Sequence, residues 1–405
     1  MNLSKAALIF ATALTLRAGV AIMDHFQPIF PDYHYSDARG YHNDAQRLLE
    51  IKRGNAENTG FPQGRRFYIA WTAALYSIFG ETPLAPRLFN AAAGALTVLI
   101  WYFILASVFR FKTATFAAGL LAVWPSHIFY SAQHLKESGV LLLTSLIFAL
   151  FLQEGLQPVI RNRRLAIASI CLAMLTFFRN HFIPFIGISI ATLSFFRARR
   201  REIKPALILI AWFAVGAGLK PIARALTNSP NETLISASVS EKLGETNRFS
   251  PSGISTFRKI RLKESAQWAL NSGHITTSQR RIETQIFPNA SFSSWLDLAL
   301  FAPKVSFYSL FMPLPGLYSI DGKLGRALSA GENTILLLFF IVALLGARKF
   351  PEPAAGAALA LFFLLTVPPA AFLEFDLGSA ARHKLAFFPI LLPFFANAAD
   401  IWTKK

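Results

Sequence analysis

Long apolar runs are the feature that most limits what this chain can fold into. A helix that crosses the hydrocarbon core of a bilayer needs about 20 mostly apolar residues. The sequence predicts ten such spans, at residues 5–25, 86–108, 113–131, 137–156, 163–179, 181–197, 204–224, 333–348, 354–373 and 384–402. We therefore expect an all-α polytopic membrane protein with about ten transmembrane helices.

The composition agrees with a chain whose main solvent is lipid. Of the 405 residues, 54% are hydrophobic and 15% are charged, whereas soluble proteins carry about 25% charged residues. A formal net charge of +18 would suggest nucleic acid for a soluble protein. Here the basic residues cluster in short loops between apolar runs, as the positive-inside rule describes. We therefore expect membrane lipids, and no nucleic acid, among the partners.

The same basic residues predict the orientation. If the N-terminus is cytoplasmic, every short inner connection is basic and both termini lie inside. The inner connections then hold Arg110 and Lys112; Arg161, Arg163 and Arg164; Arg197, Arg199, Arg200, Arg201 and Lys204; Arg348 and Lys349; and Lys404 and Lys405. An even number of spans follows from this arrangement.

Two competing interpretations concern single segments. Residues 1–23 could form a cleaved signal peptide, but the apolar run is long for one and carries Arg17 near its outer end, which favours an uncleaved anchor. Residues 295–314 could form a further span. That would place Arg348 and Lys349 outside, so the charge pattern favours an interfacial or partly inserted helix.

Two large segments then face outward, and both are expected to contain interfacial helices. Residues 65–79 are apolar but short for a span, which favours an amphipathic helix on the membrane surface. The predicted parts are a membrane region at 1–225 with its first outer loop at 26–85, an outer loop with an interfacial helix at 226–332, and C-terminal membrane helices at 333–405.

Ionisable residues near the outer ends of the spans are candidates for function, because such groups are costly at a membrane. Carboxylates can take a proton from a hydroxyl or hold a divalent cation, and arginine and lysine can bind phosphate. The candidates are Asp37, Arg39, Tyr41, Lys136, Glu137, Arg179, Arg382, His383 and Lys384. Together they suit a reaction on a lipid that carries phosphate.

Each candidate also has a purely structural interpretation. Asp37 could be an ordinary acidic residue at the start of a helix. Glu137 could pair with Lys136 or Arg39 in a solvated loop. The run from Arg382 to Lys384 could anchor a helix at the lipid headgroups.

Four stretches of the chain carry a family resemblance. Asp37 is followed by Tyr41, Ala45 and Leu48; Pro86–Thr97 reads PRLFNAAAGALT; Trp124–Ser131 precedes Leu135-Lys136-Glu137; and Arg382-His383-Lys384-Leu385 is followed by Pro389. In their order and spacing they resemble the GT-C membrane glycosyltransferases. Within these, they are most similar to bacterial relatives of protein O-mannosyltransferases and lipid A aminoarabinose transferases.

The resemblance implies transfer of a sugar from a polyprenyl-phosphate donor to a glycan, lipid or protein acceptor. Asp37 would be the base that deprotonates the acceptor hydroxyl, and the reaction would invert the anomeric carbon. Arg382, with Lys384 or Arg179, would stabilise the leaving phosphate. Glu137 would supply a second carboxylate. If a divalent metal ion is bound, Asp37 and Glu137 are its expected ligands.

The resemblance also implies a bacterial inner membrane and an active site that faces the periplasm or exterior. A transporter or flippase for a lipid-linked saccharide is the alternative, because it would need the same phosphate ligands without a base. An assembly or scaffold protein of the cell envelope is a third interpretation, and it would need neither Asp37 nor Arg382.

Overall fold

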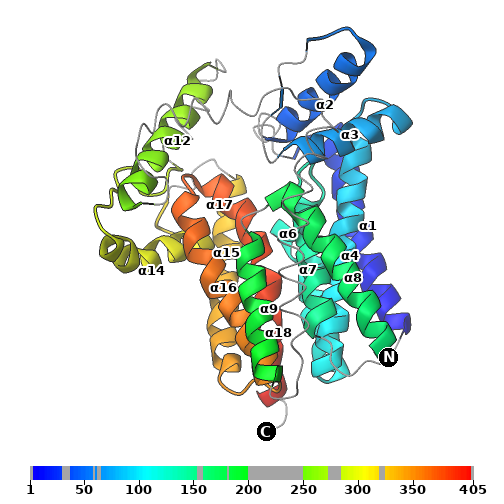
Figure 1. Ribbon diagram of the computed structural model, residues 1–405, viewed down its shortest axis with the longest axis vertical. Coiled ribbons are helices and arrows are strands. Elements are labelled where there is room, and N and C mark those ends of the chain that lie inside the picture. The colour runs from blue at the N-terminus through cyan, green and yellow to red at the C-terminus, as the bar shows by residue number, and fades with distance from the viewer. Residues whose placement is uncertain are drawn as a thin grey trace. The chain divides into compact units, whose positions relative to one another are not determined.

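The computed structural model describes residues 3–29, 37–57, 60–61, 65–152, 158–179, 182–198, 250–271, 284–318 and 324–402. Within these ranges the chain is almost entirely helical (Figure 1). The β-bridge seen among the described residues is antiparallel and joins Gln285 to Asp376. The predicted all-α class is confirmed.

Four of the described helices are long and apolar enough to cross a membrane: α1 (Leu3–Phe26), α4 (Leu84–Val108), α15 (Leu324–Ala347) and α16 (Pro353–Leu373). Four predicted spans fall on them. Further predicted spans fall on the shorter helix α7 (Glu137–Leu152), on α8 (Pro158–Arg179) and on α9 (Phe182–Ala198). The predicted span 204–224 lies outside the described residues. The chain is an integral membrane protein.

Proline breaks the two remaining predicted spans. The run 113–131 folds as α5 (Phe111–Val123) and α6 (Pro125–Ser131), because proline lacks the N–H that would continue the helix and is favoured at a helix start. The last span begins as α17 (Leu377–His383) and a 3-10 turn at Lys384–Ala386, and continues as α18 (Phe388–Trp402). The two parts meet at 58°, where Pro389 follows the first residue of α18.

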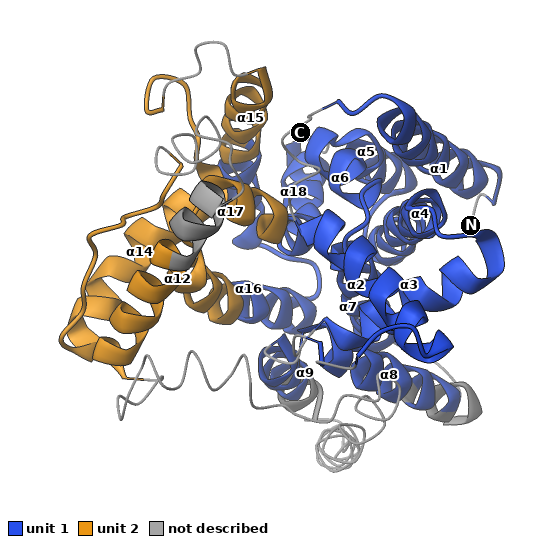
Figure 2. Cartoon of the chain, turned by 90° about the horizontal axis from the view of Figure 1, so that it is seen from above, with its two compact units in different colours: residues 1–230, 339–363, 385–405 blue, residues 231–338, 364–384 orange. Residues whose placement is uncertain are grey.

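The chain forms two compact units (Figure 2). Unit 1 consists of residues 1–230, 339–363 and 385–405, and unit 2 of residues 231–338 and 364–384. The predicted division at residues 225 and 332 follows the membrane topology, and it stays a prediction.

Unit 1 is built on α1, α4 and α7, which pack side by side (Figure 1). Small residues line the contact between α1 and α4: Ala13, Ala21, Ala91 and Ala95 are all fully buried. Small side chains let membrane helices approach closely, which is the main source of packing energy where lipid is the solvent. Helix α8 packs on α7, and α5 packs on both α1 and α4.

A buried arginine donates hydrogen bonds to the last carbonyl groups of α5. Arg17 of α1 is fully buried, and its guanidinium donates to the carbonyl oxygens of Ala122 at 2.9 Å and Leu121 at 3.2 Å. It also donates to Nδ1 of His127 at 2.8 Å. The last carbonyls of a helix have no partner within the helix, so Arg17 stabilises the break before Pro125. Its position in a predicted span is therefore explained by structure.

A second buried arginine joins three segments of unit 2 through hydrogen bonds. Arg258, on α12 (Pro251–Asn271), donates to the carbonyl oxygens of Phe372 at 2.6 Å, Glu374 at 2.7 Å and Ile286 at 2.7 Å. Beside it, Ile286 N–H donates to the Phe375 carbonyl at 2.9 Å. Arg258 thus ties α12 to the end of α16 and to the loop before α14 (Trp295–Phe311).

We predict that Gly94→Ala destabilises the protein. A methyl group at this position of α4 would lie 2.6 Å from Cβ of Ser131 and 3.0 Å from Nε of Arg17. Overpacking of this kind costs about 1–3 kcal/mol. The matched control is Gly119→Ala in α5, where a methyl group meets nothing within 4 Å. Thermal unfolding in detergent should show a lower midpoint for Gly94→Ala alone, and equal midpoints for both variants would contradict the packing described.

Candidate functional site

Asp37 is the first residue of α2 (Asp37–Arg53). The residues that follow it in the predicted motif lie four, four and three positions apart, so they share one face of the helix. Tyr41, Ala45 and Leu48 are indeed buried together. This packing fixes α2 and leaves Asp37 at its exposed N-terminal end, where the helix dipole favours a negative charge.

Arg65 holds the Asp37 carboxylate. Its Nη2 donates to Asp37 Oδ1 at 2.5 Å, and the two side chains are 33% and 30% exposed. The guanidinium also lies over the ring of Tyr41, with Cζ 5.3 Å from the ring centre. A charged group that is both paired and stacked has a fixed direction. The pair is therefore an oriented carboxylate that solvent and a substrate can still reach.

Glu137 and Arg179 form a second pair, which is almost buried. Glu137 is the first residue of α7, and Arg179 is the last residue of α8. Arg179 Nη2 donates to Glu137 Oε1 at 3.0 Å, and the side chains are 9% and 10% exposed. The neighbouring Lys136 donates from Nζ to the Phe178 carbonyl at 3.1 Å. Together these bonds tie the start of α7 to the end of α8.

Aromatic side chains connect the two pairs within unit 1. The ring of Tyr41 meets that of Tyr68 edge-on at 4.8 Å, and Tyr68 lies 6.4 Å from the ring of Phe178. Tyr68 belongs to α3 (Arg66–Phe79). Burial, with smaller contributions from the charges of Tyr41 and Glu137, raises the pKa of Tyr68, while its hydrogen bond from Asn90 opposes that rise. The Tyr68 hydroxyl is therefore neutral and lies within electrostatic reach of Glu137.

A buried ion pair joins the end of α1 to the start of α4. Arg87 Nη1 lies 3.1 Å from Asp24 Oδ2, with 4% and 3% of the two side chains exposed. Gln133 also donates from Nε2 to Asp24 Oδ2 at 3.1 Å, and the backbone N–H of Ile29 donates to Asp24 Oδ1 at 2.9 Å. Buried charges of this kind are tolerated only when they are paired and hydrogen-bonded.

Asn90 extends the same hydrogen-bond network to the segment before Glu137. Its amide nitrogen lies 2.8 Å from the Tyr68 hydroxyl, 2.7 Å from the Gln133 carbonyl and 2.8 Å from the Leu135 carbonyl. The amide therefore fixes the turn from which Lys136 and Glu137 emerge.

The buried His134 and the half-buried His42 lie beside this network. Nε2 of His134 lies 3.0 Å from Thr72 Oγ1, and Nδ1 of His42 lies 2.7 Å from the Tyr76 hydroxyl. Burial, followed by the charges of His42 and Arg87, lowers the pKa of His134 to about 3. His134 is thus neutral at physiological pH and supports the fold around α3.

The predicted basic run lies in unit 2, at the end of α17. His383 hydrogen-bonds through Nδ1 to Glu374, and Lys384 donates from Nζ to Asn333. Asn333 in turn donates to the Pro313 carbonyl at 3.0 Å. Lys384 is buried, whereas Arg382 is half-buried. These bonds fix the backbone of the run and leave Arg382 as its more accessible cation.

Six of the predicted residues belong to unit 1: Asp37, Arg39, Tyr41, Lys136, Glu137 and Arg179. Arg39 is exposed on α2. The other three predicted residues, from Arg382 to Lys384, belong to unit 2, and their convergence on the same site stays a prediction.

Four functional candidates were missed in the sequence: Asp24, Arg65, Arg87 and Asn90. The rule that marks ionisable groups near span ends applies equally to Asp24. Arg87 and Asn90 stand in the PRLFN stretch, which contributes to the family resemblance but was given no chemical role.

A divalent metal ion held by Asp37 and Glu137 stays a prediction for the described residues. They contain no group of three or more His, Cys, Asp or Glu side chains placed to hold a metal ion. Asp37 and Glu137, the predicted ligands, are each bonded to an arginine.

No protein-family model and no curated relative matches the sequence, but several solved structures are similar. ArnT from Cupriavidus metallidurans, bound to undecaprenyl phosphate, is 14% identical with a TM-score of 0.45 over 98% of this chain and 78% of that chain. The apo oligosaccharyltransferase of Archaeoglobus fulgidus is 13% identical with a TM-score of 0.50 over 98% of this chain and 50% of that one. The same enzyme tethered to an acceptor peptide is 14% identical with a TM-score of 0.48 over 99% of this chain and 49% of that one.

The likeness to the Archaeoglobus fulgidus enzyme shows a shared fold, with this chain spanning half of that enzyme's length. The resemblance to membrane glycosyltransferases that the sequence indicates is therefore confirmed at the level of the fold.

We predict that Asp24→Asn costs about 3–5 kcal/mol of stability, because it leaves the Arg87 charge buried without its counterion. The double variant Asp24→Leu, Arg87→Met should recover much of the loss, because it removes both charges. Denaturation in detergent measures both effects. As a control, Glu50→Gln in the exposed Glu50–Arg53 pair should leave stability unchanged. A double variant no more stable than the single one would contradict the ion-pair account.

We further predict that acid weakens the fold through His134. The unfolded chain binds a proton at this histidine below about pH 6.5, whereas the folded chain excludes it down to about pH 3. The contribution of neutral His134 to the free energy of unfolding is therefore fully present above the pKa that this histidine has in the unfolded chain. It decreases as the pH falls, by at most about 1.4 kcal/mol per pH unit. His134→Gln should unfold with a weaker pH dependence between about pH 7 and 5. An unchanged slope would show that His134 does not contribute.

Proposed function

We propose that this protein transfers a sugar from a polyprenyl-phosphate donor to a hydroxyl acceptor at a membrane surface. The observation that carries the proposal is the oriented, accessible Asp37–Arg65 pair, which begins the first helix after α1 in a fold shared with a membrane oligosaccharyltransferase. The four sequence stretches that resemble lipid-phosphate-dependent glycosyltransferases add support.

Asp37 acts as the base in this proposal. Its carboxylate accepts the proton of the acceptor hydroxyl while the oxygen attacks the anomeric carbon of the donor. The bond from that carbon to the phosphate oxygen breaks, and polyprenyl phosphate leaves with the electron pair. Because attack and departure occur on opposite faces, the anomeric configuration inverts. Arg65 keeps the carboxylate in one direction, so the acceptor meets a pre-positioned base.

Cationic side chains stabilise the departing phosphate. Arg382 is the accessible member of the basic run, and its planar guanidinium suits two-point contact with phosphate. Glu137 is assigned a positioning role, because its bond to Arg179 at 3.0 Å orients the guanidinium at the end of α8. Arg179 is the cation proposed for this role within unit 1.

The proposed location is the inner membrane of a bacterium, with both termini cytoplasmic and the site on the periplasmic or exterior side. The positive-inside distribution of arginine and lysine supports this orientation. The acceptor is a glycan, lipid or protein of the cell envelope.

We predict that Asp37→Asn abolishes transfer while leaving the protein folded. Loss of a general base costs about a hundred- to ten-thousand-fold in rate. In a deletion strain carrying the variant, mass spectrometry of extracted lipids should show an accumulated polyprenyl-phosphate sugar. The strain with the wild-type protein should show none.

Asp44→Asn provides the matched control, because Asp44 lies on the same helix two turns beyond Asp37. Its carboxylate has no part in the proposed reaction, so the variant should restore normal lipids. If Asp37→Asn also restores them, the proposed base is wrong, and a flippase that needs only the phosphate ligands becomes the better account.

A further inference from the structure

One face of α14 is exposed and almost wholly apolar. The exposed residues follow one another at alternating steps of one and three positions, which places them on a single face of a helix. This stripe consists of Trp295, Leu296, Ala299, Leu300, Pro303, Lys304 and Phe307. Trp295, Leu296 and Leu300 are 64%, 65% and 72% exposed.

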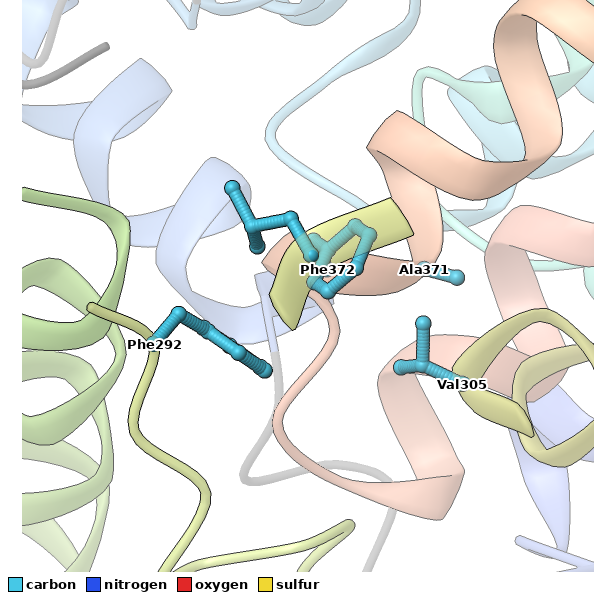
Figure 3. Close-up of a cluster of buried hydrophobic side chains, with 5 residues drawn as sticks. Phe292, Val305, Ala371 and Phe372 are labelled. Atoms are coloured by element: carbon cyan, nitrogen blue, oxygen red, sulfur yellow. The ribbon is translucent and has the colours of Figure 1, made fainter. Parts of the chain in front are cut away.

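The opposite face of α14 is packed into unit 2. Leu298 and Val305 are buried against Phe292, Ala371 and Phe372 (Figure 3). The helix therefore has a fixed rotation, with one side committed to the core of unit 2. Its apolar stripe is a stable surface of the folded unit.

The partners of this buried face fix the level of α14 relative to a bilayer. Ala371 and Phe372 belong to the last turn of α16 (Pro353–Leu373), which is long and apolar enough to cross a membrane. The end of a spanning helix lies at the boundary between hydrocarbon and headgroups. A helix packed on that end lies at the same boundary.

The direction of α14 agrees with a position on the surface. It runs across the direction of α15 (Figure 1). Its 17 residues extend about 25 Å, and α14 is not among the described helices that meet the criteria for a span.

The composition of the stripe is that of an interfacial helix. Tryptophan is enriched at the membrane–water boundary, and Trp295 begins the stripe. Lys304, its one charged member, lies with Nζ 4.9 Å from the ring centre of Phe287 and 5.6 Å from that of Phe301. A lysine held against rings can keep its stem in an apolar layer and its ammonium near lipid phosphate.

We propose that α14 lies flat on the bilayer and buries its stripe among phospholipid chains, so that it anchors unit 2 beside the end of α16. The proposal does not depend on the sugar-transfer reaction. It rests on the exposed stripe, the packing on Ala371 and Phe372, and the direction of the helix.

Spin labels on the full chain in phospholipid vesicles test this directly. Single cysteines would replace Leu296 and Leu300 on the stripe, in a Cys171→Ser background, since Cys171 is the one natural cysteine. Both labels should collide more often with oxygen, which concentrates in lipid, than with a water-soluble nickel chelate. The matched control is Lys259→Cys, an exposed position of α12 in the same unit, where the preference should reverse.

Two outcomes would overturn the proposal. Labels at Leu296 and Leu300 that meet the nickel chelate as often as the Lys259→Cys label would place the stripe in water. Immobile labels shielded from both reagents would place it against a protein, including a second copy of this chain. Because two stripe positions are labelled, a variant that fails to fold leaves the other to decide.

Discussion

The buried bond between Asp24 and Arg87 is the interaction on which the site in unit 1 depends. It joins the end of α1 to the start of α4, and through Gln133 it reaches the segment that precedes α7. Asn90 extends this connection to Tyr68 and to the backbone before Glu137. Two charges removed from water must be matched closely or the fold loses stability, so this network sets the geometry of the helix ends. Glu137 begins α7 at one of those ends, and α2, which carries Asp37, contacts the network through Tyr41 and Tyr68.

The same rule explains why polar groups gather where helices are interrupted. Arg17 donates hydrogen bonds to the last carbonyl groups of α5, before Pro125, and Arg258 donates to carbonyl groups at the end of α16. A backbone group without a partner is costly away from water, and a guanidinium, with several donors, can satisfy more than one carbonyl. Arg17 and Arg258 are thus structural, whereas Arg65 and Arg382 are more accessible and can meet a substrate.

The sequence was sufficient to predict the four long apolar helices α1, α4, α15 and α16, because the length and hydropathy of a run are local properties. It also singled out Asp37 and Glu137 as candidates, because both are ionisable residues near the ends of predicted spans. It missed Arg65 and the Asp24–Arg87 bond because these depend on how α1, α2, α3 and α4 pack. No periodic pattern in the sequence indicates that packing. The break at Pro125 is visible in the sequence, but the arginine that stabilises it belongs to another helix. The interfacial position predicted for residues 295–314 stays a prediction, although α14 itself is present at Trp295–Phe311.

The central claim is a single displacement at the anomeric carbon with Asp37 as base. The most direct test is the anomeric configuration of the transferred sugar, determined by NMR on the product that the purified protein makes from a polyprenyl-phosphate donor of defined configuration. The account predicts a product inverted relative to the donor, because the acceptor attacks opposite the departing phosphate. A product with retained configuration would require a different arrangement of groups and would contradict the account.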